Sequence, residues 1–308
     1  MDEVNDHDPV PFAPPQRLFV ELGSPPMATK THRTPAGRLV YTDVGSGPPV
    51  VFVHGNPTSA RLYRHLIDAL SPEYRCIAPD LLGFGRSEAP RDGSYRPSAH
   101  ATRTDALLTR LECSDLTLVL HDWGGPIGLS YALRHPERIR RLVLLNTWMW
   151  PLDHRPLVQL FSGCVGTPLG RLLIERANAF ARVVMPATLG TGPAPPPSWI
   201  DAYAQAMDSI PRRRACWVLA KSLRAESAWL RTLWNGRAVL RECPVLLCWG
   251  MADPAFGRES TLQRWQSAFP NTTVQRYPEV GHYVPEEVGP ALSGPVSRFL
   301  RATDAQSA

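Results

Sequence analysis

The chain has 308 residues, of which 44% are apolar and 20% are charged, and its formal net charge is +5. This mixture excludes the disordered and fibrous classes, and a chain of this length can bury a core without disulfides or a structural metal. The cations are nearly all arginines, scattered among 28 acidic residues, so a nucleic-acid partner is not expected.

Residues 1–30 are rich in proline and lack periodicity, which predicts a flexible lead-in. Further along, buried strands alternate with helices. We predict strands at 38–45, 49–55, 74–80, 115–122, 140–146, 244–250 and 272–278. We predict helices at 59–70, 98–111, 126–133 and 259–269, and a last one ending near Leu300. The alternation predicts an α/β fold with a doubly wound, mostly parallel sheet.

The segment from 150 to 236 interrupts this alternation. It is helix-prone and holds five of the nine tryptophans, which predicts a helical cap inserted into a main domain formed by residues 31–149 and 237–303. Within it, the run Arg212-Arg213-Arg214 is typical of a solvated helix face. Trp150, Phe161 and Trp199 are candidates to line a pocket under the cap, although most aromatic residues there are expected to be core.

The six cysteines form no CxxC pair and have no zinc-site spacing. Several lie inside apolar runs, which favours a reducing compartment. No secretory signal is visible at the N-terminus, and no run of about 18 apolar residues could span a membrane. We therefore expect a cytoplasmic protein with no membrane partner, no metal and no other cofactor.

The strongest chemical signal is the segment 118–126, LVLHDWGGP. A buried strand ends in His121-Asp122, and two glycines follow just before a helix, as in a nucleophile elbow. Asp122 stands where a serine esterase carries its serine. A carboxylate can displace a leaving group from saturated carbon and form an ester with it. Alone, the same aspartate could equally be a helix N-cap.

Two distant residues favour the nucleophile. Asp253 follows the predicted strand at 244–250, and His282 follows the one at 272–278. Nucleophile, acid and histidine in this chain order is the arrangement of α/β-hydrolases, and parallel strands bring their carboxyl ends together. The predicted strand at 49–55 ends in His54-Gly55, and Asn56 follows it at the start of a loop. In this architecture the backbone N–H groups of Asn56 and Trp123 would form an oxyanion hole, and their neutral side-chain N–H groups suit a departing halide.

These blocks resemble those of haloalkane dehalogenases from Arg38 to about Leu300. The matching motifs are HGNPTS at 54–59, PDLLGFGRS at 79–87, HDWGG at 121–125 and GHY at 281–283. The resemblance implies Asp122 as nucleophile, His282 as base, and Asn56 with Trp123 as halide-binding pair. One branch of that family places its acid after the strand preceding the cap, where this chain has Asn146. The acid is therefore assigned to Asp253, as in the branch with Asn and Trp halide donors.

The implied reaction converts a small hydrophobic haloalkane and water into an alcohol and a halide, and self-association into a homo-oligomer is left open. Epoxide hydrolases, which share HDWGG, are the main alternative. They usually read HGFP where this chain has HGNP, and they need cap tyrosines, of which only Tyr203 is a candidate. Fluoroacetate dehalogenases are expected to carry Arg at the position of Trp123. Coelenterazine luciferases share HGN and HDWG. A hormone-binding scaffold of this fold is expected to lack a triad member.

Overall fold

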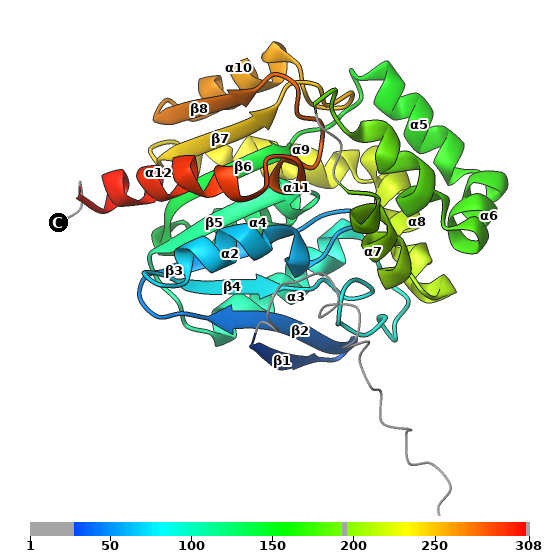
Figure 1. The fold of residues 1–308 in the computed structure, drawn as a ribbon, viewed down its shortest axis with the longest axis horizontal. Helices are drawn as coiled ribbons and strands as arrows, with labels where there is room; N and C mark the ends of the chain where they lie inside the picture. Colours follow the sequence, from blue (N-terminus) through cyan, green and yellow to red (C-terminus); the bar gives the residue numbers. More distant parts are fainter. Residues whose placement is uncertain (1–27, 193–195, 306–308) are drawn as a thin grey trace, which may run out of the picture.

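A computed structural model describes residues 28–192 and 196–305. Its centre is an eight-stranded sheet in the order β1-β2-β4-β3-β5-β6-β7-β8 (Figure 1). The strands are β1 (Thr29–Thr34), β2 (Gly37–Val44), β3 (Pro49–Val53), β4 (Arg75–Pro79), β5 (Leu116–Asp122), β6 (Ile139–Thr147), β7 (Val245–Gly250) and β8 (Thr272–Tyr277). β2 pairs antiparallel with β1 and β4, and every later pair is parallel. The predicted mostly parallel α/β sheet is confirmed.

The predicted lead-in, residues 1–30, lies outside the described residues up to residue 27. Its last two residues contradict the prediction, because β1 begins at Thr29. This strand escaped notice because it lies at the edge of the sheet, where only His32 of its six residues is buried. Without a buried face, its side chains show no apolar alternation.

Helices cover both faces of the sheet. They are α2 (Arg64–Leu70), α3 (Pro97–Arg110), α4 (Gly124–Arg134), α10 (Glu259–Ala268), α11 (Val284–Glu287) and α12 (Ser293–Ala305), with short 3₁₀ turns η1 (Ala60–Tyr63), η2 (Pro136–Arg138), η5 (Arg237–Leu240) and η6 (Gly289–Leu292). In β5, Leu118 and Leu120 pack with α3 and α4, whereas Val119 packs with α2 and α12 on the other face. A parallel strand buried on both faces must be apolar throughout, which is why it was visible in the sequence.

Two predicted helices have different limits in the structure. The first starts as the 3₁₀ turn η1 before it becomes α2, and the last continues to Ala305, beyond the predicted end near Leu300 and the predicted domain limit at 303.

The segment from residue 150 to 236, the insert, connects β6 to β7 and lies beside the carboxyl ends of the strands (Figure 1). Its helices are α5 (Pro156–Gly166), α6 (Pro168–Ala177), α7 (Pro197–Ala206), α8 (Ile210–Ala225) and α9 (Ser227–Gly236), with a π-helical turn η3 (Phe180–Val184) and a 3₁₀ turn η4 (Pro186–Thr188). Proline stands at the first position of α5, α6 and α7, where its missing N–H costs no helical hydrogen bond. The sequence did not single out α5. The predicted division into main domain and cap stays a prediction.

The expectation of a solvated arginine run in α8 is wrong for Arg212. Its side chain is buried and donates hydrogen bonds to the carbonyl oxygens of Gly85 (2.7 Å) and Ser87 (3.2 Å). Arg214 is bound as well, to Glu175 at 2.8 Å. The carbonyl oxygens that hold Arg212 lie more than 120 residues away in the chain, so no local pattern could reveal them.

No single helix among the described residues is long and apolar enough to cross a membrane. α5 and α6 meet the length and hydropathy requirement only as a pair, and the pair is bent by 75° at its junction.

Candidate active site

The turn between β5 and α4 holds Asp122 in a left-handed conformation, with φ of 50°. Left-handed backbone is unfavourable for a residue with a Cβ, so the neighbours must hold it there. The Thr147 hydroxyl donates to the carbonyl oxygen of Asp122 at 2.6 Å. A Cβ on Gly124 would lie 1.9 Å from the Val53 oxygen, and one on Gly125 would lie 1.8 Å from Thr147 Oγ1. Only glycine fits at these two positions, and the tight turn leaves the Asp122 carboxylate beside a cavity.

The loops after β7 and β8 bring the two other predicted residues to Asp122. His282 Nε2 lies 3.3 Å from Asp122 Oδ2, and His282 Nδ1 lies 2.8 Å from Asp253 Oδ2. All three side chains are buried. Asp253 Oδ1 accepts the backbone N–H of Ala255 at 2.7 Å, which orients its carboxylate. The structure thus places the three residues in one hydrogen-bonded line.

The charges of this line support one another. Burial raises the pKa of Asp253, but the His282 charge and the hydrogen bonds from His282, Asn146 and Ala255 hold that pKa below its usual value. Burial lowers the pKa of His282, but the Asp253 and Asp122 carboxylates outweigh it and raise that pKa above its ordinary value. At neutral pH the histidine is therefore an imidazolium between two carboxylates.

Asn146, at the end of β6, supports the acid. Its Nδ2 donates to Asp253 Oδ2 at 2.7 Å and to the Gly250 oxygen at 3.0 Å, while its Oδ1 accepts the Gly250 N–H at 2.8 Å. The sequence marked this position only for lacking a carboxylate. A polar residue ending a buried strand was the signal that it faces the site.

Glu287 in α11 fastens the loop that carries His282. One of its carboxylate oxygens accepts the backbone N–H groups of Gly190 (2.7 Å) and Gly281 (2.8 Å), and the other accepts that of Tyr283 (2.9 Å). The N–H of His282 itself donates to the Thr188 oxygen, at the end of η4 in the insert. Sequence reasoning missed Glu287, since an acid in the first turn of a helix is common.

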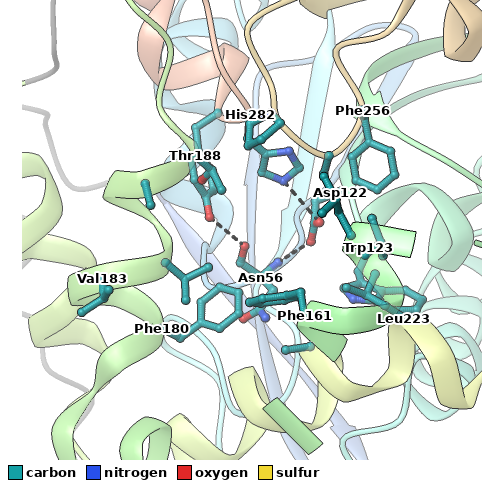
Figure 2. A pocket seen from close by; sticks show the side chains of 18 residues that line it. Asn56, Asp122, Trp123, Phe161, Phe180, Val183, Thr188, Leu223, Phe256 and His282 are labelled. Carbon is teal, nitrogen blue, oxygen red and sulfur yellow. Dashed lines mark hydrogen bonds and ion pairs between the residues drawn. The ribbon is translucent and has the colours of Figure 1, made fainter. Parts of the chain in front are cut away.

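A cavity of about 430 Å³ lies in front of Asp122, between the sheet domain and the insert. Figure 2 shows the Asp122 carboxylate between His282 and Asn56, with Phe161 and Phe180 nearby. Asp122 and His282 are the only acidic or basic side chains among the described residues that line it. The others are Asn56, Trp123, Leu157, Val158, Phe161, Phe180, Val183, Val184, Ala187, Thr188, Ala220, Leu223, Pro254, Ala255, Phe256 and Tyr283.

Of the three insert aromatics considered for this lining, Phe161 is the one that reaches the cavity. Trp150 packs instead against Trp234 and Trp265, and Trp199 packs against Tyr203 and Tyr283. Both belong to buried aromatic clusters, as most aromatic residues were expected to.

Asn56 and Trp123 both line the cavity, and each donates one side-chain N–H to a backbone carbonyl, although the Asn56 amide carries a second N–H. Asn56 Nδ2 donates to the Cys216 oxygen at 3.1 Å, and Trp123 Nε1 donates to the Leu219 oxygen at 3.0 Å. Both acceptors are backbone carbonyls of α8. The backbone N–H of Asn56 donates to Asp122 Oδ1 at 2.7 Å, as a donor of an oxyanion hole would. The role of the Trp123 backbone N–H stays a prediction.

Comparisons with known proteins agree with the fold. The family model of the alpha/beta hydrolase fold matches residues 48–287. Haloalkane dehalogenase 2 of Mycobacterium tuberculosis is 33% identical over 279 residues, covering 90% of this chain and 94% of that protein. Cis-3-alkyl-4-alkyloxetan-2-one decarboxylase of Shewanella oneidensis is also 33% identical, over 277 residues, covering 87% and 86%. The crystal structure of haloalkane dehalogenase DbeA from Bradyrhizobium elkani superposes with a TM-score of 0.76 at 25% identity, covering 89% and 99%.

Proposed function

Because the chain belongs to the α/β-hydrolase fold family, we propose that it catalyses the hydrolytic dehalogenation of small hydrophobic haloalkanes. The observation that carries this proposal is the Asp122 carboxylate, which faces an otherwise apolar cavity and contacts the His282–Asp253 pair behind it. A carboxylate in apolar surroundings is a stronger nucleophile than one in water, because fewer hydrogen bonds stabilise its charge. The relative of the same activity in Mycobacterium tuberculosis supports the assignment.

In the first step, an Asp122 oxygen attacks the halogen-bearing carbon from the side opposite the halogen. A carbon–oxygen bond forms, the carbon–halogen bond breaks, and the halide leaves with its electron pair. Asn56 and Trp123 are the neutral donors on the cavity wall that could receive it.

In the second step, His282 removes a proton from a water molecule, which attacks the carbonyl carbon of the aspartyl ester. The backbone N–H of Asn56, already bound to Asp122 Oδ1, would stabilise the resulting oxyanion. Breakdown of that intermediate releases the alcohol and restores the carboxylate. Ester formation removes the negative charge of Asp122, one of the two charges that raise the pKa of His282. The alkylated site therefore favours the neutral histidine that this step needs.

The α8 contacts add a condition to this mechanism. Trp123 has a single side-chain N–H, so a halide can take its hydrogen bond only by replacing or sharing the Leu219 carbonyl, whereas Asn56 carries a second N–H besides the one that Cys216 accepts. Halide binding should therefore weaken or replace the contact of Trp123 with α8. Bromide should then change the fluorescence of the wild-type protein, and this change should shrink in Trp123→Phe.

The central test traps the ester. His282→Phe should form a covalent adduct on Asp122 with 1-bromobutane or 1,2-dibromoethane and release one halide per chain, because hydrolysis lacks its base. Mass spectrometry detects the adduct and localises it. Asp122→Asn should form none. His154→Phe, a change at an exposed histidine, should turn over normally. No adduct in His282→Phe, together with no halide release by the wild type, would refute the proposal.

Oxetanone decarboxylation is the second candidate. The Shewanella oneidensis relative matches at the same identity, and the engagement of the single Trp123 side-chain N–H with α8 favours a reaction that releases no halide. Asp122 could open the four-membered lactone at its saturated ring carbon. The freed carboxylate then leaves as CO₂ while the bond to Asp122 breaks, which yields an alkene and needs no water. Alkene formation from a cis-dialkyl oxetanone, with no halide release from bromoalkanes, would replace the first proposal.

Epoxide hydrolysis, the alternative predicted from sequence, has less support. The Tyr203 hydroxyl donates to Glu286 at 2.7 Å, and this tyrosine is not among the cavity residues. Tyr283 does line the cavity, but its hydroxyl donates to the Asn56 carbonyl at 3.3 Å. Opening of styrene oxide by the wild type would reverse this ranking.

A further inference from the structure

The outer face of the insert carries an apolar patch. Among the described residues, the large apolar side chains that are most exposed all lie between residues 157 and 183, except Val239. They are Leu157, Leu160, Leu169, Leu172, Leu173 and Val183, with exposures of 48–66%. Figure 1 shows α5 and α6, which carry five of them, as the insert helices farthest from the sheet. Single exposed apolar side chains are ordinary, whereas six on elements that follow one another in the chain, five leucines and one valine, indicate a contact surface.

The spacing of these residues places them on one side of each helix. On α6, Leu169, Leu172, Leu173 and Arg176 follow the i, i+3, i+4, i+7 pattern of one helix side, and Leu157 and Leu160 are one turn apart on α5. Together the two helices have the length and hydropathy of a membrane span, but they are bent by 75° at their junction. This shape suits helices that lie along a membrane–water interface.

The patch reaches the mouth of the cavity. Leu157 and Val183 belong to both, since they line the cavity and are also 66% and 63% exposed. A compound leaving an apolar phase at this face would therefore enter the cavity without crossing water.

Positive charge borders the patch. Between residues 156 and 192 the only carboxylate is Glu175, and Arg171 and Arg214 both pair with it at 2.8–2.9 Å. Arg176 and Arg182 are exposed, and together with Arg213 they line a surface pocket at the end of α6 that also contains Asp208. Arg182 Nη1 lies 4.0 Å from Asp201 Oδ1, so these three arginines still outnumber the two acids beside them. Arginines beside exposed leucines are the combination that binds anionic headgroups next to acyl chains.

We propose that this face, formed by α5, α6 and η3, docks the protein on an anionic lipid surface, from which apolar substrate enters the cavity. A second copy of the chain is a poorer occupant, because it would bring Arg176 and Arg182 of two positively charged molecules together and would cover the cavity mouth. The expectation of no membrane partner rested on spanning helices, and docking at a surface needs none.

The test is vesicle flotation of the full chain, with phosphatidylcholine vesicles and with vesicles that also contain phosphatidylglycerol. The wild type should float with the anionic vesicles, and added salt should weaken binding. The affinity of the triple variant Leu169→Gln, Leu172→Gln, Leu173→Gln for the vesicles should be lower by roughly ten-fold or more, since its contacts with the acyl chains are lost. Arg176→Gln with Arg182→Gln should lose the preference for phosphatidylglycerol. Val239 is exposed like the patch residues but lies outside the patch, so Val239→Gln should bind like the wild type.

These substituted residues are exposed and none of them lines the cavity, so the far-ultraviolet circular dichroism and the reaction with a water-soluble substrate should be unchanged. Absence of wild-type flotation, or an equal loss in Val239→Gln, would overturn the proposal. So would a wild-type oligomer that the triple variant dissociates in light-scattering chromatography, because the patch would then be a contact between copies. Vesicle binding needs no turnover, so its outcome is independent of the proposed reaction.

Discussion

Asn146, at the end of β6, reaches the loop after β7 and, through the Gly281 oxygen at 3.5 Å, the loop after β8. Its Nδ2 reaches the acid Asp253 and the end of β7, and its Oδ1 holds the Gly250 N–H. Since Asp253 orients His282, the Asn146 amide acts on the histidine through Asp253. It contacts no cavity, so it is a positioning residue.

Asn146→Ala should lower kcat roughly 10- to 100-fold, because the carboxylate that orients His282 loses its main fixed donor. It should also lower the free energy of unfolding by about 2 kcal/mol, since buried acceptors are left unpaired. Halide-release kinetics and urea unfolding measure the two effects. Asn271→Ala removes an amide that donates to the Glu242 carbonyl on the surface, and it should change neither. Unchanged kcat in Asn146→Ala would contradict the positioning role.

The elements around the site meet at the loop between β8 and α11. Glu287 at the end of α11 binds backbone N–H groups on both this loop and the insert segment at Gly190, and Thr188 accepts the N–H of His282. The insert therefore helps to place His282, the proposed base, in addition to covering the cavity.

Glu287→Ala should release the loop from these three hydrogen bonds. We expect kcat to fall roughly ten-fold while KM changes little, since the cavity lining is intact and only the base is displaced. Amide hydrogen exchange at residues 279–284 should become faster. Glu279→Ala, at an exposed carboxylate of the same loop, is the matched control and should leave both quantities unchanged. A large rise in KM with normal kcat would show that Glu287 shapes the pocket instead.

At the scale of the whole molecule, the core buries several histidines in the neutral form. Burial lowers the pKa of His54, and it lowers that of His100 to about 3 and that of His121 to about 4. An unfolded chain takes up protons on these side chains below its ordinary pKa of 6.5, whereas the folded chain does not. Acid should therefore destabilise the fold well above the range in which carboxylates titrate.

Between pH 6.5 and about pH 5, His100 and His121 should each cost about 2 kcal/mol of unfolding free energy. His282 does not offset this, because its raised pKa adds stability that is fully present once pH falls to 6.5 and does not grow below it. Asp253, with a lowered pKa, loses its contribution only below about pH 4. Urea unfolding at both pH values measures the loss, and His100→Gln should reduce it by the share of His100, about 2 kcal/mol. A pH-independent unfolding free energy would contradict the neutral buried histidines.

Much of this protein could be predicted from its sequence, because the decisive patterns are local. The apolar run of β5 can be buried on both faces only inside a parallel sheet, and a polar pair followed by two glycines can only turn sharply, so Asp122 was visible before any contact was known. Asp253 and His282 followed from the rule that parallel strands gather their carboxyl ends at one edge.

Contacts between distant segments depended on the tertiary structure. Whether the N–H groups of Asn56 and Trp123 are free depends on α8, which begins more than 85 residues after either. The same holds for Arg212, whose partners lie outside the insert in the loop after β4, and for the leucines of α5 and α6, whose exposure is visible only in the folded chain. Spacing along a chain reveals which side of an element is apolar. What covers that side is set by packing between elements, and for α5 and α6 the fold leaves it open to solvent.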